Sequence, residues 1–124
     1  FVLNKLEMGK LTTHILDTAN GAPAKDVKIE LFACSTDGQK LIYSTVTNED
    51  GRCGQPLLEG KSLVTGIYEL EFYIGDYYRG MKVELTDPAF LDVVVIRFGI
   101  SSEDENYHVP LIISPFGYSS YRGS

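Results

Sequence analysis

Two histidines are the residues of this sequence best suited to moving protons. His14 lies in the segment LTTHILD (11–17) and His108 in YHVPLII (107–113), almost a whole chain apart. Because a free imidazole has a pKa of about 6.5, one histidine can accept a proton and another can donate one near neutral pH. If the fold brings them together, they are candidates for general acid–base catalysis. The alternative is a pair of unrelated histidines, each hydrogen-bonded within the fold or facing solvent.

Arg52 is the third candidate, and it directly follows the turn sequence NEDG (48–51). We expect this arginine at the first residue of the strand that returns from the turn. Its planar guanidinium can offer fixed hydrogen-bond donors to a substrate carbonyl or to a developing oxyanion. The alternative is an ordinary solvated charge beside a turn.

The end of the sequence carries further polar groups where a loose tail is the usual expectation. Its last four residues are Tyr121, Arg122, Gly123 and Ser124, which supply a phenol, a guanidinium and a hydroxyl. Chain ends usually fray and tolerate change. A tail that carries these polar groups is therefore expected to have a role in the fold or in the function.

The sequence lacks the common signatures of metal and covalent chemistry. Two histidines do not complete a zinc site, which needs three or four ligands, and Cys34 and Cys53 lack metal-type spacing. We expect both cysteines as free thiols in a reducing compartment rather than as one disulfide. A nucleophilic Cys53, activated by the adjacent Arg52, is a weaker alternative because no histidine lies near it in the sequence.

The composition is that of one folded domain without a nucleic-acid or membrane partner. The 124 residues are 44% hydrophobic and 23% charged, values close to the average of globular proteins. A formal net charge of −6 gives no broad basic footprint for phosphates. No apolar run reaches the roughly 18 residues that a membrane-spanning helix needs. We expect a cytosolic protein, with the periplasm and the peroxisome as alternatives.

The first residues of the sequence differ from the rest. The chain starts with Phe1, whereas Met8 opens the segment MGKLTTHILD. We therefore expect residues 1–7 to be an expression remnant or a processed leader, and residues 8–124 to form the domain.

Alternation of apolar and polar residues predicts β-strands along most of the chain. The clearest cases are VKIELFA (27–33) and IYELEFYI (67–74). Weaker alternation is present in LTTHILD (11–17) and LIYSTVT (41–47). LDVVVIRFGI (91–100) has an unbroken apolar run from Val93 to Ile96, which predicts a strand buried more fully, on both of its faces.

Turn sequences separate these segments and indicate the fold class. They lie at residues 20–23, 36–39, 48–51 and 114–117. Strands joined by short turns at this spacing predict an all-β, two-sheet antiparallel sandwich. One short helix is predicted within residues 75–85, with Asp76 as its N-cap.

Several segments resemble the 5-hydroxyisourate hydrolases, the transthyretin-like enzymes of urate breakdown. The similarity runs from Met8 to Ser124 and is carried by LTTHILDTANGAPAKDVKIEL, TNEDGR, GIYELEFYIGDYY, VVIRF and YHVPLIISPFGYSSYRGS. Its most specific element is the terminal YRGS (121–124), a signature of the enzymes that the hormone-carrying transthyretins lack.

The resemblance implies a transthyretin-like β-sandwich of eight strands with one short helix. It also implies a homotetramer whose dimer interface forms a through-channel, with the last residues of each chain lining active sites in that channel. Mapped onto this sequence, the implied catalytic residues are His14, Arg52, His108 and Ser124, and the implied substrate-binding residues are His14, Arg52, Tyr121 and Arg122. The resemblance implies no cofactor and no metal.

The activity that the resemblance implies is hydrolysis of a cyclic amide bond of 5-hydroxyisourate, which gives 2-oxo-4-hydroxy-4-carboxy-5-ureidoimidazoline. The histidine pair would activate water, Arg52 would stabilise the developing oxyanion, and Ser124 would hydrogen-bond the water or a histidine. Which histidine is the base stays open at this point. The alternatives are a carrier that uses the same channel for a small aromatic ligand, and an immunoglobulin-like adhesion domain that would leave the terminal motif unused.

Overall fold

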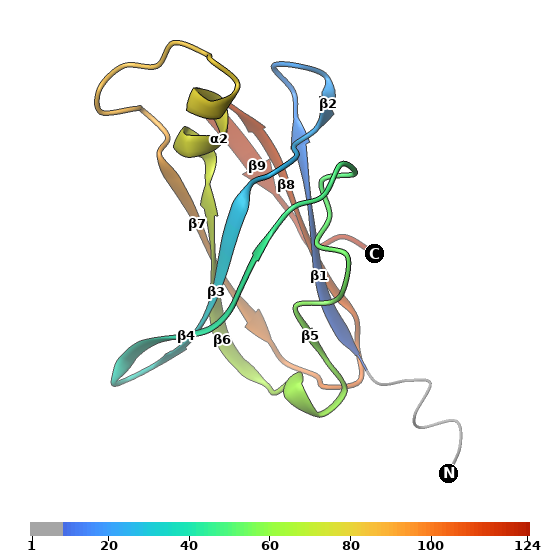
Figure 1. Cartoon of the computed structure of the whole chain (residues 1–124). Helices are drawn as coiled ribbons and strands as arrows, with labels where there is room; N and C mark the ends of the chain where they lie inside the picture. The colour runs from blue at the N-terminus through green and yellow to red at the C-terminus, as the bar shows by residue number, and fades with distance from the viewer. Residues whose placement is uncertain (1–8) are drawn as a thin grey trace.

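The alternating segments of the sequence form two β-sheets that pack face to face (Figure 1). The computed structural model describes residues 9–124, so the expectation about residues 1–7 lies outside the described residues. The first sheet has the strand order β2 (Ala22–Pro23), β1 (Lys10–Asp17), β8 (Tyr107–Ser114) and β9 (Gly117–Ser120), and β5 (Leu58–Glu59) also pairs with β1. The second sheet has the order β4 (Gly38–Val46), β3 (Lys28–Ser35), β6 (Gly66–Tyr73) and β7 (Val93–Ile100).

The core lies between the two sheets and is built from every second residue of the central strands. Leu11 and Ile15 of β1 are fully buried, as are Leu31 of β3 and Leu70 of β6. Each such side chain contributes roughly 1.5–3 kcal/mol when it leaves water. The alternation predicted for the two clearest segments is therefore confirmed, and the polar positions between these residues face outward. Between residues 9 and 124, no helix has both the length and the apolar character needed to span a bilayer.

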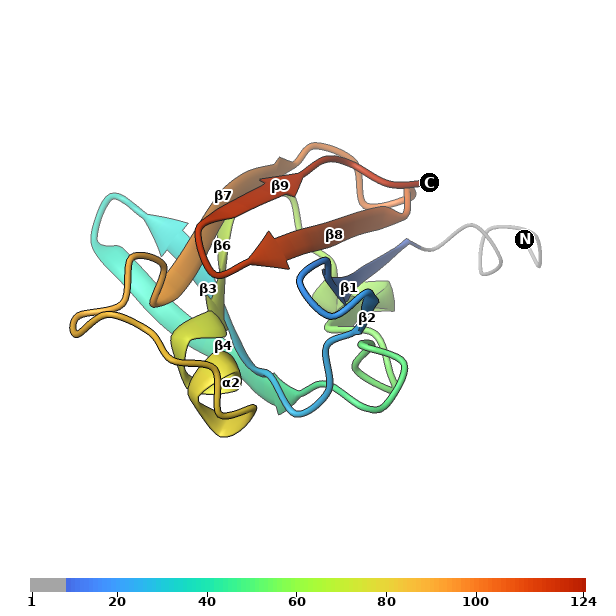
Figure 2. The ribbon, with the colours of Figure 1, turned by 90° about the horizontal axis from the view of Figure 1, so that it is seen from above.

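The sandwich is not antiparallel throughout, which corrects the predicted topology. β1 and β8 are parallel neighbours, as Figure 2 shows in the view from above, with β8 between β1 and β9. Parallel strands cannot be joined by a tight hairpin. Here the chain leaves β1, builds the whole second sheet and only then returns as β8. Short-range turn signals carry no information about such a distant pairing.

The predicted burial of the 91–100 segment on both faces is wrong. β7 begins at Val93, and its burial alternates, with Val93 37% exposed and Val95 45% exposed in the single chain. The reason is the two-layer architecture, in which β7, like the other strands of the second sheet, meets the core with only one of its faces.

The predicted helix exists but is shorter and differently capped. α2 spans Ile74–Gly80, and Asp76 lies in its first turn instead of at the N-cap, which is Tyr73. β6 runs directly into this helix, so no loop residue is free to serve as the cap. Lys82 has a φ of 62°, a left-handed conformation that cannot continue an α-helix. A single turn of 3₁₀-helix, η1 (Gly60–Ser62), follows β5.

A buried carboxylate fastens α2 to the end of β1. Asp17 is 0% exposed, and its oxygens accept hydrogen bonds from the hydroxyls of Tyr77 (2.7 Å) and Tyr78 (2.8 Å) and from the side-chain amide of Asn20 (2.6 Å). Burial alone would raise the pKa of Asp17, but the hydrogen bonds from Tyr77, Tyr78 and Asn20 outweigh it and hold the pKa below its usual value. The same contact raises the pKa of Tyr77 to about 12 through burial and the bond to Asp17.

Replacing Asp17 with alanine is expected to lower the free energy of unfolding by about 3 kcal/mol, because the buried hydroxyls of Tyr77 and Tyr78 lose their acceptor. Urea denaturation followed by circular dichroism measures this loss. Asp104→Ala is the matched control, since Asp104 is exposed in the loop before β8. Equal stability of the two variants would contradict the structural role of Asp17.

Candidate active site

The two histidines lie on neighbouring strands and on the same, outward face of the first sheet. The parallel pairing sets Thr12 opposite His108 and His14 opposite Pro110. Since alternate residues of a strand point the same way, His14 shares its face with Thr12, while Leu11 and Ile15 point into the core. The fold therefore brings together two side chains that are nearly a chain length apart in the sequence.

Arg52 is held beside the histidines by a tightly bonded loop between β4 and β5. The side-chain oxygen of Asn48 accepts the backbone N–H groups of Asp50 (2.9 Å) and Arg52 (3.2 Å), and the Arg52 carbonyl accepts the Asn48 N–H at 2.7 Å. The Gly51 carbonyl accepts the N–H of Ile15 at 2.9 Å, which ties the loop to β1 directly after His14. These hydrogen bonds explain why the backbone at Arg52 lies next to β1. The prediction that a strand starts at Arg52 is wrong, because β5 begins only at Leu58.

Gly51 is required at this contact for two reasons. Its φ of 74° is a conformation that residues with a Cβ rarely adopt. A Cβ built there would also lie 2.5 Å from the carbonyl oxygen of Ile15. Only glycine lets the loop approach β1 closely enough to place Arg52.

Both imidazoles are held in the neutral form at neutral pH. Burial is the largest cause that lowers the pKa of His14 and of His108, and the positive charge of Arg52 lowers both further. His14 also lowers the pKa of His108, whereas backbone hydrogen bonds at Asp50 and Thr12 oppose these shifts in part. A neutral imidazole is the form that accepts a proton, so each histidine is ready to act as a general base.

The C-terminal tail closes over His108. The Gly123 N–H donates to the His108 carbonyl at 2.7 Å, in an isolated antiparallel bridge. A Cβ on Gly123 would lie 2.7 Å from Cδ2 of the His108 ring, so the tail packs directly on the imidazole. A hollow of about 300 Å³ lies beside this contact, and its lining consists of Lys10, Thr12, Arg52, Asn106, His108 and Ser124.

The predicted site residues thus fall into two groups. Arg52, His108 and Ser124 share the polar hollow, and His14 lies next to it, two residues along β1 from Thr12. Tyr121 and Arg122 instead line a second hollow of about 240 Å³, together with Ile96, Phe98, Gly99, Tyr107, Val109 and Ser120. The structure of the single chain therefore does not bring Tyr121 or Arg122 to the histidines.

Thr12 is a site residue that the sequence analysis did not identify. Its hydroxyl lies 2.8 Å from Nδ1 of His108, across the parallel pair of strands. This contact fixes the ring and leaves Nε2 as the nitrogen available to water or substrate. The signal was present in the spacing of Thr12 and His14 on one face, but the pairing of β1 with β8 is needed to interpret it.

The structure weighs against Cys53 as a nucleophile. Cys34 and Cys53 are both free, as predicted. Burial raises the pKa of the Cys53 thiol to about 11, so it stays protonated at neutral pH despite its neighbour Arg52. Within residues 9–124, no group of three or more His, Cys, Asp or Glu side chains is arranged to hold a metal ion.

The two-sheet sandwich and its site on the outer face define a transthyretin-like protein. Sea bream transthyretin, solved in complex with thyroxine, has the same fold with a TM-score of 0.82 and 26% identity, over 92% of this chain and 94% of that chain. The predicted fold class is therefore confirmed.

The chain belongs to the HIUase/Transthyretin family, whose sequence pattern matches residues 11–123. It is 56% identical to a 5-hydroxyisourate hydrolase of Pseudomonas aeruginosa over 117 residues, which are 94% of this chain and 93% of that protein. The structure of Klebsiella pneumoniae 5-hydroxyisourate hydrolase matches with a TM-score of 0.78 and 31% identity, over 94% of this chain and 100% of that chain.

Proposed function

We propose that this protein hydrolyses 5-hydroxyisourate in the hollow that contains Arg52, His108 and Ser124. The observation that carries this proposal is the placement of two imidazoles with lowered pKa values on one face of the first sheet, beside the guanidinium of Arg52. The high identity to a 5-hydroxyisourate hydrolase supports the choice of substrate. The planar ring of the substrate, with its carbonyl groups, suits a guanidinium that presents donors in one plane.

The reaction needs three things from the site, and the residues of the hollow can supply each of them. A water must lose a proton as its oxygen attacks the carbonyl carbon of the cyclic amide, and neutral His108 or His14 accepts that proton. The carbonyl oxygen becomes negative, and Arg52 stabilises it. The C–N bond then breaks, and the protonated histidine returns the proton to the leaving nitrogen. The product is 2-oxo-4-hydroxy-4-carboxy-5-ureidoimidazoline, and one water is consumed.

Ser124 and Thr12 have supporting roles in this mechanism. Ser124 lines the same hollow as His108, and its hydroxyl can hold the attacking water by a hydrogen bond. Thr12 holds Nδ1 of His108, so that Nε2 faces the reaction. Tyr121 is 60% exposed and reaches the substrate in this proposal only through assembly with another copy of the chain.

Replacing Thr12 with valine is expected to lower kcat about tenfold with little change in KM, because one hydrogen bond of about 1.4 kcal/mol no longer orients His108. Thr12→Ser keeps the hydroxyl and should retain most of the activity. Initial rates of 5-hydroxyisourate loss measure both variants. Equal activity of valine and serine at this position would show that the hydroxyl does not position the ring.

The competing function is that of a carrier for a small aromatic ligand, as suggested by the match to a thyroxine-bound transthyretin. Carrier pockets are lined mostly by apolar side chains. The hollow here presents Lys10, Thr12, Arg52, Asn106, His108 and Ser124, all of which are polar or charged. This lining favours a polar substrate and hydrolysis over storage of an apolar ligand.

The test is to generate 5-hydroxyisourate from urate with urate oxidase and to follow its ultraviolet absorbance with and without the protein. We expect decay far faster than the spontaneous reaction, at protein concentrations far below that of the substrate. A parallel equilibrium dialysis with thyroxine tests the carrier. Decay at the spontaneous rate together with tight thyroxine binding would replace the hydrolase proposal by the carrier.

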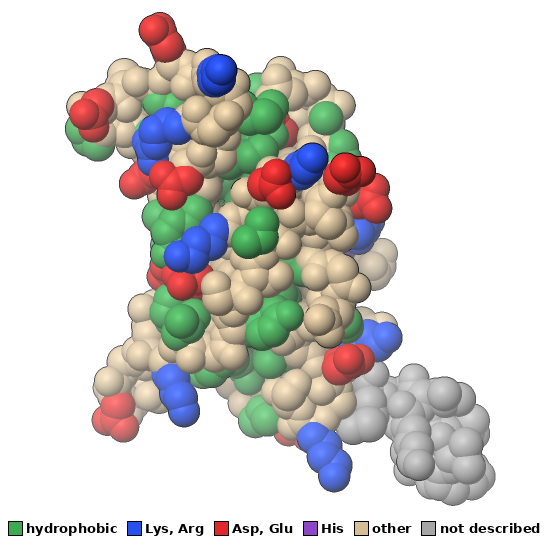
Figure 3. Space-filling view, in the orientation of Figure 1, with side chains coloured by type: hydrophobic (Ala, Val, Ile, Leu, Met, Phe, Trp, Pro, Cys, Tyr) green, Lys and Arg blue, Asp and Glu red, His purple; other side chains and the backbone are tan. Residues whose placement is uncertain are grey.

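We also propose that the protein assembles as a homotetramer. Apolar side chains are exposed along one edge of the sandwich, on β7 at Val93 and Val95 and on the β8–β9 turn and β9 at Phe116 and Tyr118. Exposed apolar strips next to edge strands are typical of interfaces. On the face shown in Figure 3, basic and acidic side chains are interspersed, without an extended basic patch. Sedimentation equilibrium would give the mass of four chains if the proposal holds.

A further inference from the structure

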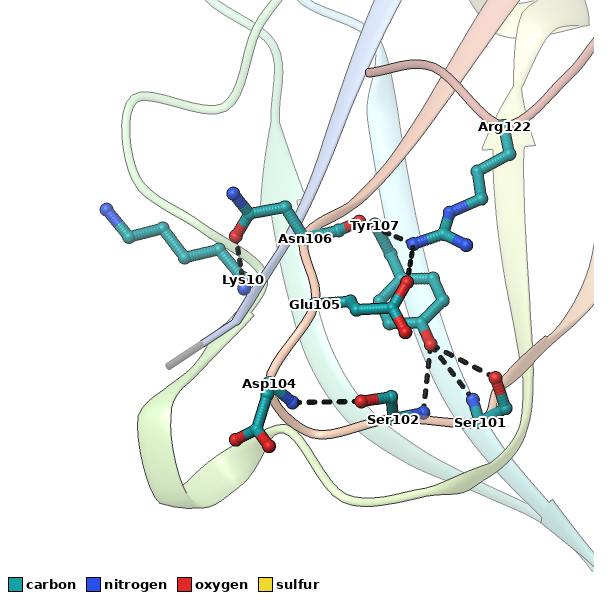
Figure 4. Close-up of polar contacts among 8 residues, drawn as sticks. All are labelled: Lys10, Ser101, Ser102, Asp104, Glu105, Asn106, Tyr107 and Arg122. Carbon is teal, nitrogen blue, oxygen red and sulfur yellow. Dashed lines mark hydrogen bonds and ion pairs between the residues drawn. The ribbon is translucent and has the colours of Figure 1, made fainter. Parts of the chain in front are cut away.

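Arg122 is engaged in a set of contacts that face away from the histidines. Its guanidinium lies over the ring of Tyr107, with Cζ 4.2 Å from the ring centroid (Figure 4). One of its nitrogens donates to the carboxylate of Glu105 at 3.0 Å and to the backbone carbonyl of Asn106 at 2.9 Å. Stacking combined with directed hydrogen bonds is a geometry that arginine makes and lysine does not.

Tyr107 is a rigid platform for this contact. Its side chain is 4% exposed, and its hydroxyl oxygen accepts the backbone N–H groups of Ser101 (3.1 Å) and Ser102 (2.9 Å). The next residue back, Asn106, accepts the N–H of Lys10 on its side-chain oxygen at 3.0 Å (Figure 4). The loop under Arg122 is therefore joined both to its own strand and to the beginning of β1, two residues before Thr12.

The tail beyond β9 depends on few attachments. The last strand, β9, ends at Ser120, and after it the backbone makes the bridge between Gly123 and His108. Arg122 comes directly before Gly123, so its contacts fix the chain at the point where the bridge must form. Ser124 then follows in the polar hollow.

We infer that Arg122 is a positioning residue that latches the tail onto the loop of residues 101–106, and that it is not a substrate contact. The latch seats Gly123 against the His108 ring and thereby carries Ser124 to the hollow. This replaces the substrate-binding role expected from the resemblance. Its link to catalysis rests on the proposed hydrolase function, whereas its link to the order of the tail does not.

The test compares Arg122→Gln with Arg79→Gln. Arg79 is a matched control because it is another exposed arginine, and its replacement removes hydrogen bonds to two carboxylates, those of Asp76 in α2 and of Asp92 directly before β7. Amide hydrogen exchange at Gly123 is measured first, on the substrate-free protein. We expect exchange about tenfold faster in Arg122→Gln, because a stacked cation and two hydrogen bonds are lost. Arg79→Gln should leave exchange at Gly123 unchanged.

Kinetics then separate a latch from a substrate contact. A latch predicts that Arg122→Gln lowers kcat about tenfold while KM stays within about twofold, since the lost interaction is not with the substrate. Arg122→Lys keeps the charge beside Glu105 and should recover part of the loss. Removing Ser124 in the Arg122→Gln background should cost less than removing it from the unaltered protein, because both changes act through the tail.

Two other outcomes would distinguish failure of the latch from failure of the proposed function. Unchanged exchange at Gly123 combined with a raised KM would overturn the latch and restore Arg122 as a substrate contact. If the unaltered protein showed no hydrolysis, the function proposed above would fail, but exchange at Gly123 would still support or reject the latch.

Discussion

Replacing His108 with asparagine is expected to lower kcat by about two to four orders of magnitude while the fold stays intact. Asparagine is polar and can still bond the hydroxyl of Thr12, which lies 2.8 Å from Nδ1 of the histidine. It cannot take up or return a proton between pH 5 and 8, so one of the two imidazoles that the proposed proton transfers require is lost. The measurement is the initial rate of 5-hydroxyisourate loss, with circular dichroism and sedimentation to check structure and assembly.

His14→Asn is the natural companion variant, because His14 lies on the same face and Arg52 lowers the pKa of both imidazoles. If the two histidines act as a unit, the double variant should be little worse than the more damaged single variant. Retention of activity within about twofold in His108→Asn would contradict the mechanism and return His108 to a structural role.

Replacing Arg52 with glutamine is expected to lower kcat/KM by about 10²–10³-fold, the loss typical when a donor to an oxyanion is removed. Arg52→Lys keeps the charge but not the planar fork and should recover only part of the activity. Arg97→Gln is the control, since Arg97 is also an exposed arginine but pairs with Glu69 (2.8 Å) on the second sheet. Activity should be unaffected in that control.

The same Arg52→Gln variant should change the pH dependence in a defined direction. Burial and Arg52 both lower the pKa of His14 and His108, so the activity of the unaltered protein should fall only below pH about 6.5, as the histidines take up protons. Without the charge of Arg52, both pKa values rise toward the ordinary value. The acid limb of kcat/KM therefore moves to higher pH, and a limb that stays in place or moves lower would contradict the electrostatic role of Arg52.

The sequence allowed much of the architecture to be predicted because alternation is a local property. Ile29, Leu31, Leu70 and Phe72 are all buried, and their spacing by two residues is visible without any structure. The burial of β7 was overestimated because the packing of a whole sheet is not a local property of the sequence. An apolar run does not reveal whether the outer face of a sheet is covered by another layer, and the outer face of β7 is exposed in the single chain.

The candidate site could be assembled only in part from the sequence. His14, Arg52 and His108 were candidates from their side-chain chemistry, and the resemblance grouped them with Ser124. The parallel pairing of β1 with β8 explains how the two histidines come to lie on neighbouring strands. Thr12 was missed because its role depends on that long-range pairing. Residue type alone also did not reveal that Arg122 stacks on Tyr107, and the substrate-binding role expected for Arg122 stays a prediction beside the latch proposed above.

A single-turnover experiment is the sharpest test of the proposed mechanism, because excess protein converts the bound substrate once and product release no longer limits the rate. 5-Hydroxyisourate is mixed rapidly with an excess of the protein, and its absorbance is followed over a range of pH. The proposed mechanism predicts a first-order decay at least about 10³-fold faster than the spontaneous reaction, lost in His108→Asn and weakened as pH falls below about 6.5. A rate constant equal to that of the spontaneous reaction, or one that His108→Asn leaves unchanged, would contradict it.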